Sequence, residues 1–242
     1  MISRKAGFIT LLCLFILISL CTPVTAYSDD AVKWYTEGNG LLQSKNYTDA
    51  IAAYDQAILI EPGYAEAWNG EADALNRVAH SDAGFNQTLL GAALAASNRS
   101  ISISPGYTQA WINRGQILYN TGLWYENQAR DVKTADVYYN DQLLAYEKAI
   151  EIDPSNTEAW FNKGFALGGL GRYDEAIAAF DKVQGINPAY PRIAYYRTMA
   201  VQLRDASTPF YIKYAGIIIG GIIVCAGVGL WYCYLRERSD SE

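Results

Sequence analysis

The sequence offers few residues that could carry out covalent chemistry. It contains a single histidine, His80, and its four cysteines lie in pairs near the two ends of the chain. A lone histidine far from any cysteine is a poor basis for a metal site or for an activated nucleophile. The glycine-rich segment at 168–171 lacks the Lys-Ser/Thr pair of a phosphate-binding loop. The sequence therefore predicts a protein that is not an enzyme and that uses no metal or other cofactor.

Composition and charge exclude several further classes. The chain has 242 residues, of which 51% are hydrophobic and 18% are charged, so it is neither a disordered chain nor a bundle of many membrane spans. Its net charge of −6 argues against binding to nucleic acid, which needs a basic surface. The middle of the chain, residues 27–210, is acidic and free of cysteine. We expect packing alone, without disulfides, to hold this region together.

Residues 1–26 have the pattern of a signal peptide. Arg4 and Lys5 precede an apolar run at 6–21, and small residues lead to a cleavage site after Ala26. The run is short for a membrane span. We expect export with cleavage after Ala26; an uncleaved signal anchor is the alternative.

The C-terminal part of the chain has the pattern of one membrane span. Residues 215–234 carry no charge, and a helix of that length matches the hydrocarbon core of a bilayer. Aromatic residues flank the run, and two arginines follow it, which favours a cytoplasmic end. We expect a linker at 205–210, a transmembrane helix at 211–235 and a cytoplasmic tail at 236–242. The predicted location is the cell membrane, with a single pass and the preceding domain outside.

Small residues recur every four positions within this expected span. They are Gly216, Gly220, Gly221, Cys225 and Gly229. Such spacing lets two helix backbones approach closely, so it predicts self-association through the transmembrane helix. The alternative is that glycine is simply common in membrane helices.

Two segments of equal length, 31–64 and 157–190, repeat one pattern. Each has Trp at its fourth place, Gly at the eighth, Leu at the eleventh, Tyr at the seventeenth, Ala at the twentieth, an aromatic residue at the twenty-fourth and Pro at the thirty-second. The first three places share one face of a helix, and the Ala and aromatic places share one face of a second helix. Proline then ends the second helix. Each segment therefore predicts a pair of packed helices.

This pattern resembles the tetratricopeptide repeat. Degenerate copies at 65–107 and 108–156 lie between the two clear ones, and 191–204 is similar to one further first helix that caps the stack. The resemblance implies an all-α superhelix of about four repeats plus the capping helix, over an exported domain at 27–204, followed by the single transmembrane helix. The repeat junctions are similar to those of methanogenic archaeal proteins of this kind.

Both degenerate copies are longer than one period of the repeat. The extra residues fall at about 78–88 in the first copy and at about 124–140 in the second. The second insert contains no Gly or Pro, so we expect it to lengthen helices rather than to form a loose loop.

The resemblance also implies a concave groove, lined by first helices, that binds a segment of a partner protein. Its asparagines and aromatic rings would suit hydrogen bonding to a peptide backbone. The basic residues with which some family members clamp acidic chaperone peptides are absent from the matching places. We therefore expect a scaffold for an unidentified protein or peptide segment. The candidate groove residues are Tyr35, Asn39, Asn69, Asp73, Ile112, Gln116, Tyr119, Phe161, Phe165 and Tyr195.

The aromatic residues of the second insert support an alternative function. If Trp124, Tyr125, Tyr138 and Tyr139 were exposed together, the protein would be a cell-surface receptor for carbohydrate, since sugars stack on such rings. The chain also has three Asn-x-Ser/Thr sequons, which are possible glycan sites in an exported protein. They begin at Asn46, Asn86 and Asn98.

Overall fold

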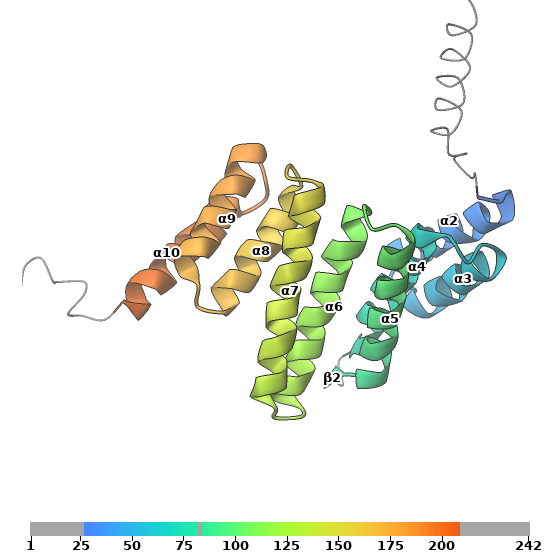
Figure 1. The fold of residues 1–242 in the computed structure, drawn as a ribbon, viewed down its shortest axis with the longest axis horizontal. Coiled ribbons are helices and arrows are strands. Elements are labelled where there is room, and N and C mark those ends of the chain that lie inside the picture. Colours follow the sequence, from blue (N-terminus) through green and yellow to red (C-terminus); the bar gives the residue numbers. More distant parts are fainter. Residues whose placement is uncertain (1–26, 82–83, 209–242) are drawn as a thin grey trace, which may run out of the picture.

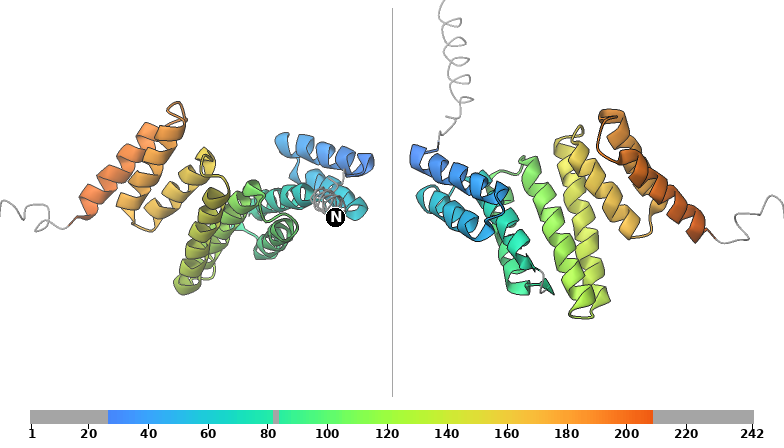
Figure 2. Two further views of the ribbon diagram at one scale, coloured as in Figure 1. Left: turned by 45° about the horizontal axis from the view of Figure 1, so that its top comes forward. Right: turned by 180° about the vertical axis from the view of Figure 1, so that it is seen from behind.

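The computed structural model describes residues 27–81 and 84–208, which form a row of antiparallel helices (Figure 1). Figure 2 shows the same row from two other sides. This is the expected all-α, tetratricopeptide-like architecture; the described strands form one short hairpin. The elements are α2 (Asp29–Gln43), α3 (Tyr47–Ile60), α4 (Ala65–Ala79), β1 (His80–Ser81), β2 (Gly84–Phe85), α5 (Gln87–Ile103), α6 (Thr108–Asn127), α7 (Val132–Ile152), α8 (Thr157–Gly169), α9 (Tyr173–Ile186) and α10 (Ile193–Ser207).

The helices form two layers. Helix α2 contacts α4, α4 contacts α6, and α6 contacts α8, so the first helices of successive pairs line one side of the row. Helices α3, α5, α7 and α9 pack as second helices, each against the first helix before it and the first helix after it. The inner layer is where the groove was expected.

Glycines and aromatic rings explain how the helices of a pair approach each other. The ring of Tyr54, on α3, is fully buried. A Cβ atom at Gly38 of α2 would fall 2.7 Å from the Cε1 atom of this ring, and one at Gly70 of α4 would fall 2.6 Å from it. Phe180 packs in the same way against Gly164 in the last full pair. The small eighth place and the aromatic twenty-fourth place are therefore direct partners.

The repeated tryptophans join one helix pair to the next. The indole Nε1 atoms of Trp68, Trp111 and Trp160 donate hydrogen bonds of 2.9 to 3.1 Å to backbone oxygens. In each case the acceptor belongs to the proline six residues earlier, just after the preceding second helix has ended. The bond satisfies a carbonyl group that the helix cannot use and fixes the angle between consecutive pairs.

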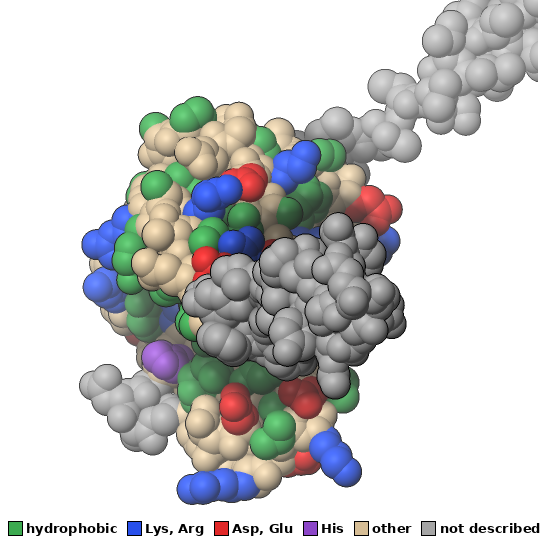
Figure 3. Space-filling view, turned by 90° about the vertical axis from the view of Figure 1, so that its left-hand side faces the viewer, with side chains coloured by type: hydrophobic (Ala, Val, Ile, Leu, Met, Phe, Trp, Pro, Cys, Tyr) green, Lys and Arg blue, Asp and Glu red, His purple; other side chains and the backbone are tan. Residues whose placement is uncertain are grey.

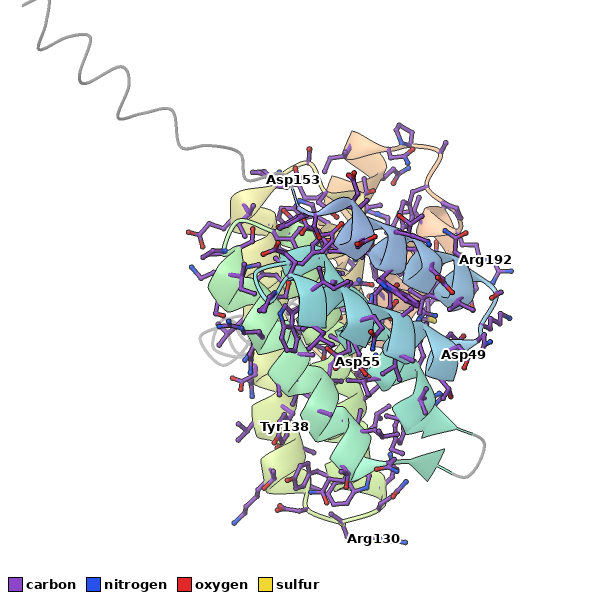
Figure 4. The ribbon with its side chains drawn as sticks, turned by 90° about the vertical axis from the view of Figure 1, so that its right-hand side faces the viewer. Asp49, Asp55, Arg130, Tyr138, Asp153 and Arg192 are labelled. Carbon is purple, nitrogen blue, oxygen red and sulfur yellow. The ribbon has the colours of Figure 1, made fainter. Side chains whose placement is uncertain are left out.

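The two inserts have different structures. The first one contains the hairpin, in which His80 pairs with Phe85 and their rings lie 4.7 Å apart. The second one lengthens α6 and α7, as expected from its composition. Arg130 has a φ of 58° in the loop between these two helices. Figure 4 shows Arg130 in this loop between α6 and α7, and Tyr138 a short way along α7.

The C-terminal boundary differs from the expected one. Helix α10 continues to Ser207, so the first part of the linker expected at 205–210 is helical. Arg192 precedes α10 with a φ of 59°, where the chain turns from α9 (Figure 4). The expected signal peptide at 1–26 and the expected transmembrane helix at 211–235 lie outside the described residues. In the part that is described, no helix has the length and apolar character needed to span a bilayer.

One buried carboxyl group stands out among the described residues. The Oε2 atom of Glu71, on α4, is shielded from solvent and has no hydrogen-bond partner there. Burial, and then the nearby carboxylate of Asp55, raise the pKa of Glu71 from 4.5 to about 7. Burial also raises the pKa of Asp55, which lies on α3 (Figure 4). The fold therefore favours the protonated form of Glu71 over the ionised form.

This pKa shift predicts how the stability of the protein depends on pH. The pKa of Glu71 is higher in the folded protein than in the unfolded chain. The contribution of this carboxyl group to stability is therefore fully present below about pH 4.5 and is lost as the pH rises to about 7. Glu71→Gln should therefore raise the free energy of unfolding by about 1–2 kcal/mol at pH 8 and by much less at pH 4.5. Urea unfolding at both pH values measures this, with Glu37→Gln, at an exposed site on α2, as the control. An equal effect of the Glu71 substitution at both pH values would contradict the raised pKa of Glu71.

Candidate peptide-binding groove

The inner face of the helical row contains three adjoining hollows. They are an N-terminal hollow of about 200 Å³, a central hollow of about 460 Å³ and a C-terminal hollow of about 490 Å³. Asp73 and Gln116 line both of the first two, and Tyr119 and Phe165 line both of the last two. The shared residues make the three hollows one continuous groove that crosses α2, α4, α6, α8 and α10. Seven of the ten candidate groove residues line it: Tyr35, Asn39, Asn69, Asp73, Gln116, Tyr119 and Phe165.

Amide side chains in the N-terminal half of the groove bind one another across the helices. The Nδ2 atom of Asn113 on α6 donates to the Oδ1 atom of Asn69 on α4 at 2.9 Å. Further along the same two helices, Asn120 donates to Asn76 at 2.8 Å in the same way. Asn39 accepts a hydrogen bond of 2.8 Å from the hydroxyl group of a core tyrosine. The two amide pairs therefore join neighbouring repeats, and the free hydrogen-bonding capacity of the groove is smaller than the sequence suggested.

Carboxylates dominate the charge in the N-terminal half of the groove. Glu66, Asp73 and Glu158 line the N-terminal hollow, together with one cation, Arg77. The Nε atom of Arg77 lies 2.9 Å from Asp73 Oδ1. Burial, and then the charge of Asp73, raise the pKa of Glu158. Gln116 lies at hydrogen-bond distance from Glu158, 3.5 Å from its Oε1 atom. The arrangement leaves a surplus of negative charge facing the groove.

The C-terminal half of the groove is apolar. Phe165 of α8 is 46% exposed, although it is a large hydrophobic side chain. It lines both the central and the C-terminal hollow, as does Tyr119 of α6. Leu203 of α10 is 42% exposed in the same C-terminal hollow. Figure 3 views the molecule from the α9–α10 end, where hydrophobic and charged side chains are interspersed.

Three candidate groove residues lie elsewhere. Ile112 is fully buried in the core cluster between α6, α7 and α8, so its assignment to the groove is wrong. Phe161 packs on the same core cluster, and its ring lies 5.0 Å from that of Tyr196 on α10. Tyr195 is 62% exposed but lines none of the three hollows. Ile112 and Phe161 both occupy the fifth place of their repeats, and in these two repeats that place packs against the following helices. In the first two repeats the same place, held by Tyr35 and Asn69, lines the groove.

A second helix also brings residues to the groove that the repeat pattern did not predict. Tyr139 and Gln142 of α7 line the C-terminal hollow, although we expected the lining to come from first helices. The ring of Tyr139 packs against Gly122 of α6, and its hydroxyl group donates to Glu126 Oε2 at 2.6 Å. The lengthened α6–α7 hairpin carries these residues, so the signal for them was the length of the second insert.

The insert aromatics do not form one exposed surface. Trp124, Tyr125, Tyr138 and Tyr139 are all half-buried. Tyr138 stacks on Tyr125 with ring centroids 5.2 Å apart, and both line a separate hollow against α5. Tyr139 instead faces the groove. The carbohydrate alternative therefore lacks the shared aromatic surface that it required.

The remaining candidate sites are the three sequons, the small-residue face of the expected span and any group of metal ligands. The sequon residues Asn46, Asn86 and Asn98 are all exposed, and each forms a hydrogen bond through its side chain. The small-residue face from Gly216 to Gly229 lies outside the described residues. Within residues 27–81 and 84–208, His, Cys, Asp and Glu side chains form no group of three that could hold a metal ion.

Fold and groove together define a helical-repeat protein with a concave, segment-sized surface. Family models for the tetratricopeptide repeat match residues 31–64 and 145–178. The first match coincides with the first expected repeat, and the second one begins within α7 and ends within α9. Two segments of the chain therefore match the tetratricopeptide repeat by sequence, and the described residues share the fold of solved tetratricopeptide proteins. Such repeats generally mediate protein–protein interaction.

Solved structures share the fold at low sequence identity. The thermophilic tetratricopeptide protein TTC0263 of Thermus thermophilus is 16% identical, with a TM-score of 0.58 over 70% of this chain and 80% of that chain. A MamA protein is 18% identical, with a TM-score of 0.51 over 78% of this chain and 89% of that chain. MamA from residue 41 onward, of Desulfovibrio magneticus, is 14% identical, with a TM-score of 0.51 over 76% of this chain and the whole of that chain. No curated protein matches the sequence.

Proposed function

We propose that this protein is a membrane-anchored, non-enzymatic scaffold whose groove binds an extended segment of a partner protein. The observation that carries the proposal is the continuity of the groove from α2 to α10, with polar groups in one half and exposed apolar side chains in the other. A groove of this form offers polar side chains that can form hydrogen bonds to the backbone of a segment, and apolar pockets for its side chains. Its walls are rigid helices, so little ordering accompanies binding.

Site-specific photo-crosslinking in native membranes tests this proposal. A photoreactive residue at Gln116 or Phe165, in the groove, should give an adduct with the same partner protein. A photoreactive residue at Leu59, which is 73% exposed on the outer helix α3, is the matched control and should give no such adduct. Equal adducts from Leu59, or none from the two groove positions, would contradict the proposal.

The membrane anchor and the orientation form part of the same proposal. The basic and apolar pattern of residues 1–26 supports export, and the uncharged run at 215–234 supports a span with its C-terminal end in the cytoplasm. The acidic repeat domain would then stand away from an anionic membrane surface, which leaves the groove accessible.

A cysteine at Ser44 tests the orientation. Ser44 is exposed at the end of α2, so Ser44→Cys should react with a membrane-impermeant maleimide on intact cells. The unsubstituted chain, whose own cysteines all lie in the expected signal and span, is the control. Labelling only after lysis would place the domain inside the cell and overturn this part of the proposal.

A further inference from the structure

The C-terminal hollow has an apolar floor and an acidic rim. Its floor includes Phe165 and Leu170 of the α8 segment, Phe180 of α9 and Met199 of α10. Two carboxylates, Glu126 of α6 and Asp136 of α7, also line it. No Lys, Arg or His side chain is among the described residues that line this hollow.

Part of the apolar floor remains exposed. Phe165 is 46% exposed and Leu203 is 42% exposed, whereas Phe180, in the same hollow, is 3% exposed. Covering an exposed apolar side chain is favourable by about 25 cal/mol for each Å² removed from water. The hollow therefore suits a large aliphatic or aromatic side chain that would cover Phe165 and Leu203 at once.

The N-terminal end of the groove is negatively charged as well, whereas the central hollow between the two ends is lined by Asp73, its ion-pair partner Arg77 and His80. Glu66, Asp73 and Glu158 line the N-terminal hollow, where Arg77 is the one cation among the described lining residues and is already paired with Asp73. A segment that lies in the groove would therefore meet carboxylates on both sides of the apolar floor. Lysine or arginine near its apolar anchor would be attracted, and acidic side chains would be repelled.

We propose that the occupant of the groove is a protein segment in which one or more large apolar anchors are flanked by lysine or arginine. The anchor would enter the C-terminal hollow against Phe165 and Leu203. The flanking basic side chains would face Asp136 and Glu126 at the rim and the carboxylates of the N-terminal hollow. This inference rests on the function proposed above, because it names the chemistry of the segment that the same groove would bind.

Selection from a random peptide library displayed on phage tests the inference. The probe is the library itself, selected against the full chain in detergent micelles, and the selected peptides are then synthesised. We expect the selected sequences to combine Leu, Ile, Phe, Met or Trp with Lys or Arg, and to be depleted of Asp and Glu. Their affinity should fall as the salt concentration rises, because exposed charges are screened.

Two substitutions with matched controls locate the bound peptides. Phe165→Ala should weaken binding by about tenfold or more, which corresponds to the loss of an apolar anchor contact. Tyr195→Ala, which removes an exposed aromatic side chain of α10 outside the hollows, should leave binding unchanged. Asp136→Lys should weaken binding of the basic peptides, whereas Asp30→Lys, at an exposed site on α2, should not. Asp136 is exposed, so Asp136→Lys should leave the fold intact. It therefore still tests the inference if Phe165→Ala unfolds the protein.

The outcomes separate this inference from the proposed function. Selected peptides that are acidic or lack apolar anchors, but still depend on groove residues such as Gln116, would overturn the inference and leave the scaffold function intact. Selection of no peptide, or only of peptides that ignore every groove substitution, would overturn both. Basic, apolar peptides that depend on Phe165 and Asp136 would support both.

Discussion

Ile112→Ala is expected to lower the free energy of unfolding by about 2–5 kcal/mol, the range for truncation of a fully buried aliphatic side chain. Ile112 is 0% exposed and belongs to the cluster that includes Leu143 and Tyr146 of α7 and Ala159 of α8. Its removal would leave a cavity where three helices meet, and the packed neighbours would relax only in part. Urea unfolding followed by tryptophan fluorescence measures the loss.

The matched control for this substitution is Gln116→Ala, one helical turn further along α6. Gln116 is half-buried and faces the groove, so its truncation should change stability by less than about 1 kcal/mol. In contrast, it should weaken binding of a groove ligand. A small effect of Ile112→Ala on stability, similar to that of Gln116→Ala, would restore Ile112 to the groove and show that the described packing of α6 against α8 is wrong.

Gly70→Ala is expected to destabilise the protein by about 1–3 kcal/mol through a steric clash. The added Cβ atom would fall 2.6 Å from the Cε1 and Cζ atoms of Tyr54. That ring cannot easily move away, because Gly38 approaches it as well and its hydroxyl group is held by Asn39 at 2.8 Å. The clash would therefore push α3 and α4 apart. The shift in the urea midpoint measures the effect.

A second glycine provides the control for this experiment. Gly40 also lies within a helix, but a Cβ atom there would have no neighbour within 4 Å. Gly40→Ala should therefore stabilise the protein by about 0.5–1 kcal/mol, the usual gain in a helix interior. Adding Tyr54→Leu to Gly70→Ala should recover part of the lost stability. Equal effects of the two glycine substitutions would show that helix propensity, and not contact with Tyr54, decides the outcome.

The sequence by itself determined the repeated helix pairs and much of their packing. The tryptophan, glycine, alanine, aromatic and proline places recur at fixed spacing, and neighbours in the sequence become neighbours in the fold. The contacts between Tyr54 and Gly38, and between Trp111 and the preceding proline, follow from these local patterns. The composition of the second insert likewise predicted the long α6 and α7, because a segment without Gly or Pro favours continued helix.

Only the tertiary structure decided which first-helix side chains face the groove. Ile112 and Gln116 are four residues apart and share one face of α6, yet one is buried and the other lines the groove. The difference depends on how α7 and α8 pack against α6, and helix periodicity within one repeat does not contain that angle. Tyr139 reached the groove for the same reason, because the lengthened α6–α7 pair packs against α8 and lines the same C-terminal hollow as α10. Contacts between distant residues therefore selected the groove from the larger set of faces that the repeat pattern allowed.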